Sequence, residues 1–142
     1  MTLGELRPFI STKIAALNLK EWTDGFNTAN IPANILDGAF HVEIGSGISG
    51  SASQLVHEFR VPFTVRVFFK GFRNPADAKD KALTRANDVL TALLKPTVRL
   101  GGVDNLKDIR PVSLTPVPLA SSNDNSLILE LVFEAVLNYR FA

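Results

Sequence analysis

The segment Leu55–Phe69, with the sequence LVHEFRVPFTVRVFF, decides the fold. Its odd-numbered positions are all apolar except His57, whereas most of its even-numbered positions are polar or charged. Because side chains alternate between the two faces of a strand, this pattern predicts a strand with one buried face. Pro62 cannot donate a hydrogen bond to a neighbouring strand. We therefore expect an edge at this point, with a bulge or a bend as the alternatives.

A second segment, Leu127–Phe141, has apolar or aromatic residues at every odd-numbered position and predicts another long strand. Its even-numbered positions mix charged residues with Ile128, Val132 and Val136. Before it, Ile109–Leu119 contains three prolines and predicts an extended segment at a sheet edge. Residues 121–126 are polar and predict a hairpin loop between these two strands.

The remaining segments predict two helices and a short strand. Apolar residues spaced three or four apart indicate an amphipathic helix over Leu3–Leu19, although Pro8 favours a regular start near Arg7. Asn74 and Pro75 suit the start of a second helix, which runs to about Leu94. An Asp37-Gly38 turn precedes a short strand over Ala39–Ile44. We read residues 20–37 as irregular and residues 45–50 as a flexible stretch.

Together these elements predict one α+β domain over residues 1–142. We expect a mainly antiparallel twisted sheet, two amphipathic helices on one of its faces, and long projecting β-hairpins.

The two long strands exceed the expected size of the domain. Leu55–Phe69 spans ~50 Å if it is continuous, and a compact chain of this length is only about 37 Å across. A projecting hairpin would expose apolar surface, so we expect another subunit to cover Phe68, Ile128, Val132 and Val136. The alternative is a shorter first strand, with a bulge at Pro62 and a helical turn over Ser51–Glu58.

Composition excludes several classes of function. Fifteen basic and fourteen acidic residues give a net charge of +1, too small for a strong attraction to nucleic acid or an anionic membrane. The chain contains no cysteine, so it has no disulfide, no thiolate nucleophile and no cysteine-based zinc site. Its apolar runs are far shorter than the ~20 residues of a membrane helix. We expect a soluble cytosolic product.

Few residues are candidates for chemistry. Gly45, Gly47 and Gly50 match the spacing of a dinucleotide-binding loop, but a strand pattern follows them instead of a helix, which favours a mobile loop. His41 and His57 lie on predicted strands without acidic or histidine neighbours at metal-ligand spacing, which favours structural roles. We predict no catalytic residue, no metal site and no cofactor.

Four basic residues, Arg60, Arg66, Lys70 and Arg73, form a modest basic stretch that allows two interpretations. In one, they belong to a solvated strand face and pair with Glu130 and Glu134 across the sheet. In the other, they form a basic lining that faces a phosphate backbone.

The order of elements resembles that of the tail terminator proteins of long-tailed bacteriophages, the siphovirus type. The resemblance covers nearly the whole chain and rests on five stretches: Asn30-Ile31-Pro32, Asp37–Glu43, Phe63–Phe69, Asn74–Asp77 and Asn138–Phe141. It implies a structural, non-enzymatic subunit of a hexameric ring that caps the tail tube, stops its polymerisation and provides the head-docking interface.

The resemblance also implies the partners and the location. The ring would contact the tail tube protein and a head-completion or connector protein, and DNA would pass through its lumen without sequence specificity. The strand pattern, and not the resemblance, leads us to expect Arg60, Arg66 and Lys70 to face this lumen. It would form in the host cytoplasm and remain in the virion at the head-proximal end of the tail, with no membrane partner. The alternatives are another neck or tail completion ring protein, and a small-ligand-binding α+β domain that uses the glycine-rich loop.

Overall fold

The computed structural model describes residues 3–22, 37–46, 48–52, 56–70, 75–95, 105–118 and 126–140. These ranges contain helices α1 (Leu3–Ala15) and α2 (Pro75–Leu94). They also contain the strands β1 (Lys20–Glu21), β2 (Ala39–Ile44), β3 (Ile48–Ala52), β4 (Val56–Phe69), β5 (Leu106–Pro118) and β6 (Leu127–Arg140). The predicted α+β class is confirmed.

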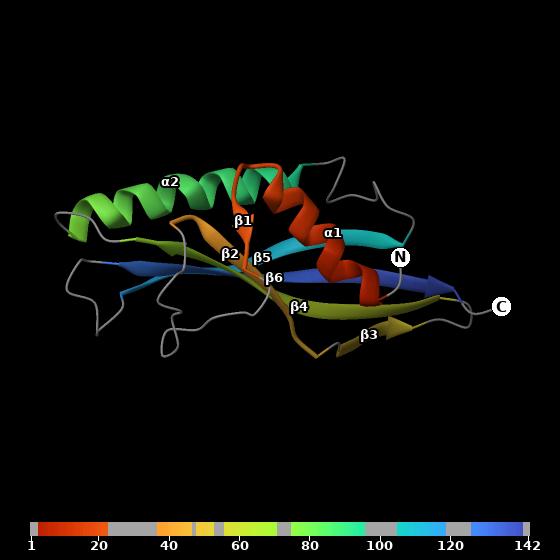
Figure 1. Cartoon of the computed structure of the whole chain (residues 1–142). Coiled ribbons are helices and arrows are strands. Elements are labelled where there is room, and N and C mark those ends of the chain that lie inside the picture. The colour runs from red at the N-terminus through yellow and green to blue at the C-terminus, as the bar shows by residue number, and fades with distance from the viewer. Residues whose placement is uncertain are drawn as a thin grey trace.

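The strands form one sheet in the order β1-β2-β4-β6-β5, and β3 pairs with β4 beside β2 (Figure 1). All neighbours are antiparallel except β1 and β2, which are parallel. The sheet is therefore mainly antiparallel, as predicted. The parallel strand β1 lies in a stretch that we expected to be irregular, and residues 23–36 of that stretch lie outside the described part of the chain.

The central feature is the pairing of β4 with β6. Every residue from Val56 to Phe69 has a partner between Arg140 and Leu127, without a shift of register. Fourteen residues at ~3.3 Å each give a strand of about 46 Å. The predicted long strand is confirmed, and the alternative of a helical turn is wrong where residues are described, because Ser51 and Ala52 belong to β3 and Val56–Glu58 to β4.

The predicted edge position of Pro62 is wrong, because β4 lies inside the sheet. The carbonyl of Pro62 accepts a hydrogen bond from the amide of Gly45 at 2.7 Å. Since the nitrogen and carbonyl of a strand residue point to the same side, the missing donor of Pro62 also faces this side. Here the partner of β4 changes from β2, which ends opposite Phe63, to β3, which begins opposite Arg60. Pro62 therefore fits an interior strand where one neighbour ends.

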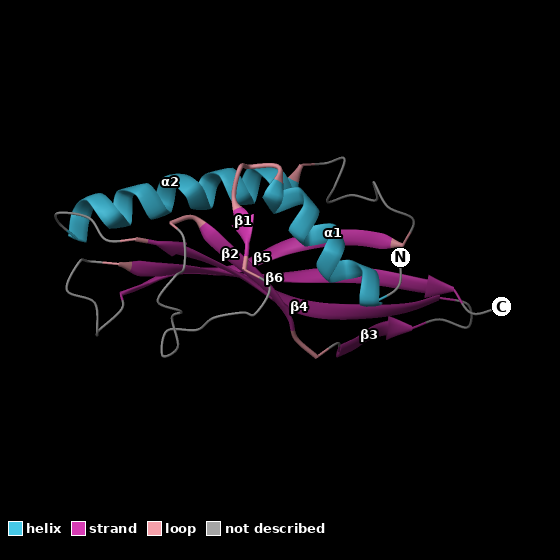
Figure 2. Cartoon of the chain, in the orientation of Figure 1, coloured by secondary structure: helices cyan, strands magenta, loops and turns pink. Residues whose placement is uncertain are grey.

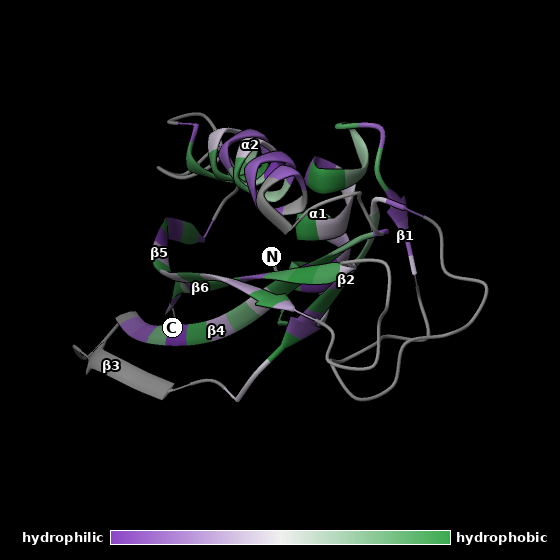
Figure 3. Cartoon of the chain, turned by 90° about the vertical axis from the view of Figure 1, so that its left-hand side faces the viewer, coloured by the Kyte–Doolittle hydropathy of each residue, from purple (hydrophilic) through white to green (hydrophobic). Residues whose placement is uncertain are grey.

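Both helices pack on one face of the sheet (Figures 2 and 3). Their apolar stripes and the odd-numbered residues of β4 and β6 form one hydrophobic core. Leu6, Ile10 and Ile14 of α1 are fully buried in it, as are Val89 and Leu93 of α2. The predicted arrangement of two amphipathic helices on one face is confirmed.

The two helices differ in how well their starts were predicted. The second begins at Pro75, as expected from the preference for proline in the first turn. The first begins at Leu3 and contains Pro8, so the predicted start near Arg7 is wrong. Pro8 has no N–H to donate to the carbonyl of Gly4. Both residues are exposed, so water can hydrogen-bond to this carbonyl instead. The buried stripe of the helix is unaffected.

The long strands do not leave their apolar side uncovered. In Figure 1 the two helices together span most of the length of the sheet. From Val61 to Phe69 every odd-numbered residue of β4 is at most 2% exposed, and from Leu127 to Leu137 every odd-numbered residue of β6 is at most 5% exposed. The strands are as long as expected, but the expected consequence, an exposed apolar face, is wrong for this side of the sheet.

The remaining elements mostly follow the sequence pattern. Asp37 and Gly38 form a turn, in which Gly38 has a φ of 81° and donates its amide to the carbonyl of Phe68 at 2.8 Å. The strand β5 lies at an edge, as its prolines predicted. In contrast, part of the stretch that we read as flexible forms β3. The predicted hairpin loop lies outside the described residues except for Ser126.

Candidate interaction surface

The face of the sheet opposite the helices carries most of the residues that the sequence singled out. We call it the open face: it presents the even-numbered side chains of β4 and β6 together with their register partners on β2 and β5. The odd-numbered side chains of the two long strands point to the helices. Because side chains alternate along a strand, the even-numbered side chains lie on the open face.

One end of the open face is apolar and closed. Phe68 is 4% exposed and Ile128 is 0% exposed, and both pack with Ala39 and the half-buried Trp22 in a second, small hydrophobic cluster. Trp22 is held there because its amide donates to the carbonyl of Phe40 at 2.7 Å, next to the pairing of β1 with β2. As subunit-interface residues, Phe68 and Ile128 are corrected: contacts within the chain already bury them.

The other two predicted interface residues differ from each other. Val136 is 0% exposed, and in the register it lies between Arg60 of β4 and Asp108 of β5. It too has no surface left for a second subunit. Val132 is half-buried and lies opposite Thr64 and Ser113 in the middle of the open face. Of the four, only Val132 retains surface that another subunit can contact.

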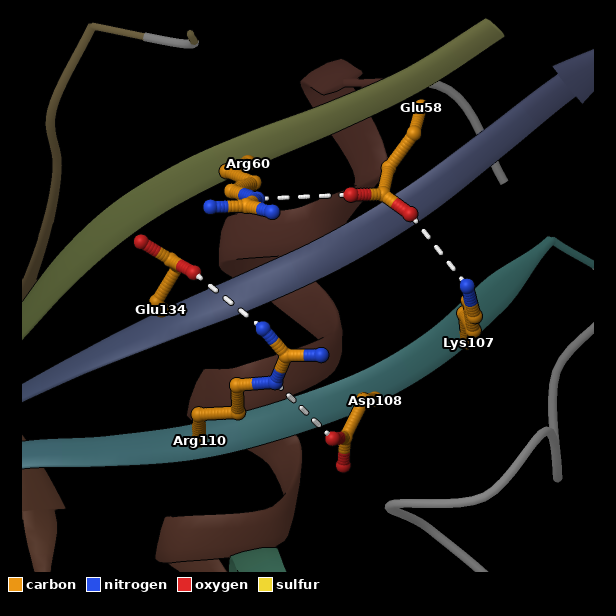
Figure 4. A network of polar contacts seen from close by, with 6 residues as sticks. All are labelled: Glu58, Arg60, Lys107, Asp108, Arg110 and Glu134. Atoms are coloured by element: carbon orange, nitrogen blue, oxygen red, sulfur yellow. Dashed lines mark hydrogen bonds and ion pairs between the residues drawn. The ribbon is translucent and has the colours of Figure 1, made fainter. Parts of the chain in front are cut away.

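A network of ion pairs crosses β4, β6 and β5 at the end of the open face that holds Val136 (Figure 4). Its centre is Glu58, whose carboxylate accepts hydrogen bonds from Arg60 Nε at 3.3 Å and from Lys107 Nζ at 3.2 Å. Beside it, Arg110 Nε donates to Asp108 at 3.2 Å, and another Arg110 nitrogen lies 4.0 Å from Glu134. The network links the strands through side chains.

Glu58 is the most buried charge of this network, with 7% of its surface exposed. The hydrogen bond from Lys107 lowers the pKa of Glu58 below its ordinary value of 4.5, and Arg60 acts in the same direction against the effect of burial. A carboxylate that is hydrogen-bonded to two cations is favoured in its charged form. Glu58 therefore remains an anion and a fixed acceptor at neutral pH.

A second charged cluster surrounds Arg66, further along β4. Its guanidinium forms ion pairs with Glu43 of β2 and with Glu130 of β6, the latter at 3.1 Å. Burial lowers the pKa of Arg66, but the hydrogen bonds to Glu43 and Glu130 outweigh burial and raise this pKa above its ordinary value. The predicted pairing of this strand face with Glu130 is confirmed for Arg66. Glu134, the other predicted partner, lies near Arg110 instead.

The three predicted DNA-facing residues do not form a continuous basic patch. Arg60 and Arg66 are six residues apart on β4, about 20 Å at strand spacing, and each is paired with at least one carboxylate. Lys70 is exposed just beyond the end of β4, where its backbone amide donates to Asp37 at 2.8 Å. In the two ion-pair clusters, four basic side chains face five acidic ones. This part of the open face is close to neutral.

The candidates for chemistry have structural positions. His41 Nδ1 lies 2.9 Å from the carbonyl oxygen of Trp22, and the ring of His57 stacks on Phe59 with centroids 4.9 Å apart. Gly45 is required by packing, because a Cβ atom there would lie 2.9 Å from the ring of Pro62. Gly50 belongs to β3, and Gly47 lies outside the described residues. As expected from the pattern, a strand follows the glycines.

The described residues also contain no candidate metal site and no helix that could cross a membrane. Among the described residues, no three His, Cys, Asp or Glu side chains group closely enough to bind a metal ion. Neither helix described here combines the length and the apolar character needed to cross a membrane.

The sequence reasoning missed the contribution of β5 to this surface. The predicted extended segment begins at Ile109 and leaves out Lys107 and Asp108, whereas β5 begins at Leu106 and its register shifts between Leu106 and Asp108. The shift breaks the regular alternation, so periodicity could not have placed these charges on the open face. The only available signal was the cluster of opposite charges, which does not identify its partners.

No protein-family model matches the chain, and no curated protein gives a significant match.

Proposed function

We propose that this chain is a structural subunit of a bacteriophage tail terminator ring. The observation that supports this most is the fold: two helices on one face of a mainly antiparallel sheet with 14-residue strands, in the element order on which the resemblance rests. The resemblance implies an α+β subunit of this kind. In this proposal, several copies of the chain form the ring that caps the tail tube and stops its growth.

The open face fits a contact surface better than a reaction site. Its charged side chains are held by neighbours of opposite sign, and its apolar end is closed by Trp22. Such a surface has a fixed shape and little net charge, which suits recognition of a partner by shape and by local charge. Val132, at its centre, is the residue we expect to contact a neighbouring subunit.

The partners follow from the same proposal. Six copies would form a ring that contacts the tail tube protein on one side and the head-completion or connector protein on the other. DNA would pass through the lumen without sequence specificity. Since Arg60 and Arg66 are paired with carboxylates, we now expect weak electrostatic attraction to DNA at these positions, which favours sliding over binding. The protein would reside in the virion.

The direct test adds the purified chain to tail tubes that are polymerising from purified tube protein. We expect elongation to stop and a ring to be visible at one end of each tube in negative-stain images. Tubes without the added chain show the unrestricted growth rate. Tubes that elongate at this same rate with the chain present, and that carry no extra density at their ends, would contradict the proposal.

The alternative small-ligand domain has less support. It requires a phosphate-binding loop at the glycines, but Gly45 packs against Pro62 and Gly50 lies in a strand. No described contact favours this alternative, and we do not propose it.

A further inference from the structure

The strand β5 forms one long edge of the sheet. Among the described residues it pairs only with β6, so its outer side faces away from the sheet. This edge also carries exposed apolar surface, since Val112, at a shift of the register, is 63% exposed. An extended edge with apolar side chains is a template for pairing with a strand of another chain.

The backbone directions in the sheet can be derived from three hydrogen bonds. The carbonyls of Pro62 and Phe68 accept from Gly45 and Gly38, so even-numbered residues of β4 direct their backbone groups away from β6. Backbone groups alternate along a strand, so the odd-numbered residues of β4 face β6, and their odd-numbered partners on β6 face β4. Even-numbered residues of β6 therefore face β5, as the amide of Asn138 does when it donates to Asn105.

These backbone directions show which way the prolines of β5 point their backbone nitrogens. Pro111, Pro116 and Pro118 lie opposite Phe133, Leu129 and Leu127, which are odd-numbered residues that face β4. The backbone nitrogens of all three prolines therefore point outward, away from the sheet. Ser113, Thr115 and Val117 lie opposite even-numbered residues and direct their amides toward β6. Each proline thus occupies a position where the sheet itself needs no backbone N–H donor. A strand added at this edge would need a donor there.

The opposite edge is closed by a different means. Beyond the short pairing with β1, the outward carbonyl of Val42 on β2 accepts a hydrogen bond from Arg7 Nε at 3.1 Å. The Arg7 guanidinium also forms an ion pair with Glu21, which accepts a hydrogen bond from Ser11 at 3.1 Å. A helix side chain therefore occupies an acceptor that an added strand would use.

We propose that Pro111, Pro116 and Pro118 close the β5 edge to strand pairing with a second copy of this chain. Among the residues between Pro111 and Pro118 that have a register partner on β6, Leu114 still directs its own N–H outward. One donor does not support a ladder of hydrogen bonds. The edge can therefore keep its exposed apolar side chains without forming an intermolecular sheet.

A closed β5 edge also limits how copies of the chain can contact one another. Only the assignment of the ring contacts to other surfaces, which include Val132 on the open face, rests on the proposed function. The closed edge itself is independent of that proposal. A chain that forms no ring would contradict the tail terminator function and leave the role of the prolines intact.

The test replaces all three prolines with alanine, which restores the outward N–H groups and adds no apolar surface. We expect the P111A/P116A/P118A variant to form species whose mass keeps rising with concentration beyond that of a closed ring, with the amide I infrared band of intermolecular β-sheet. The wild type and the control Pro8→Ala, which removes an exposed proline from α1, should lack this band, and their mass should not exceed that of a closed ring. A folded triple variant with the mass and spectrum of the wild type would overturn the proposal.

A measurement on the wild type covers the case in which the triple variant does not fold. Amide hydrogen exchange should be at least tenfold faster at Leu114, whose N–H points outward, than at Thr115, whose N–H points toward β6. Equal protection of the two amides would mean that the β5 edge is paired, and would overturn the proposal without any variant.

Discussion

Glu58 shows how one side chain on the open face joins two strands. Its carboxylate accepts hydrogen bonds from Arg60 on its own strand and from Lys107 on β5, across β6. These bonds lower the pKa of Glu58 in the folded chain. The charged form of Glu58 is therefore a part of the folding energy that depends on pH.

We predict that Glu58→Gln lowers the free energy of unfolding at pH 7, because both cations lose their charged acceptor. The wild type should lose this advantage on acidification. Since the folded-state pKa is depressed, the stabilisation is complete above the ordinary value of 4.5 and is lost as the pH falls through the lowered value. Urea unfolding of both proteins between pH 7 and pH 2 measures the difference.

The matched control is Glu134→Gln, which removes a partly exposed carboxylate 4.0 Å from Arg110. Exposed pairs contribute only about 0–1 kcal/mol, so this change should have a small effect. If the stability difference between wild type and Glu58→Gln does not shrink as the pH falls below 4.5, the assigned role of the Glu58 carboxylate is wrong.

Phe68 and Val132 separate core residues from contact residues on the open face. Phe68→Glu places a charge in the cluster with Ile128 and Trp22, where Phe68 is only 4% exposed. An uncompensated buried charge costs on the order of 3–5 kcal/mol, so we expect loss of stability. Val132→Glu should fold, because the side chain is half-buried and reaches water. Thermal unfolding monitored by circular dichroism compares the two.

Either of two results would contradict this assignment. A Phe68→Glu protein as stable as the wild type would show that the apolar end of the open face is not closed. A Val132→Glu protein that does not fold would show that Val132 belongs to the core.

At the scale of elements, the pairing of β4 with β6 carries the fold. Phe63 and Phe133 are register partners whose rings stack with centroids 5.1 Å apart, and both are at most 1% exposed. They lie under the helices near the middle of both strands. A cavity here should weaken the sheet and its contact with the helices together.

We predict that Phe133→Ala lowers the free energy of unfolding by about 3–5 kcal/mol, the range for a buried phenylalanine. Val112→Ala, at a residue that is 63% exposed, should change it by no more than about 0.5 kcal/mol. Denaturant titration of both variants gives the two numbers. Similar effects at the two positions would contradict the burial of Phe133 in the core between the sheet and the helices.

Most of these elements could be predicted from local pattern. The short-range geometry of the chain sets the two-residue period of a strand and the period of about 3.6 residues of a helix. Because one side of β4, β6, α1 and α2 is buried, apolar residues recur in the sequence with these periods. The positions of Pro8 and Pro62 could not be predicted. The first depends on exposure of one helix side, and the second on where β2 ends and β3 begins. Both are properties of the assembled fold.

At the scale of the whole molecule, the sequence predicted the length of the strands but not what covers them. The estimate of a compact globule treats the chain as a sphere, whereas the helices and strands form an elongated two-layer body (Figure 1). The sequence also did not predict that one end of the open face is closed. Trp22 packs there because it directly follows β1, a parallel strand of two residues. Two residues give no periodic signal.

This shape changes the physical basis for assembly. Subunits are not needed to cover bare apolar strands, because the helices and the cluster around Trp22 bury those side chains. In the proposed ring, association would instead use partly exposed residues such as Val132 and the ion-paired surface beside it. We therefore expect ring contacts of moderate strength, which would allow the free chain to exchange between separate subunits and a ring.

The measurement that tests the ring proposal most directly is the mass of the full chain at rising concentration, by light scattering after size exclusion, with negative-stain images of the same fractions and of mixtures with tail tubes. We predict closed rings of six copies, in solution at high concentration or at tube ends. A chain that keeps the mass of one subunit at every concentration, and that forms no ring on tail tubes, would contradict the proposal.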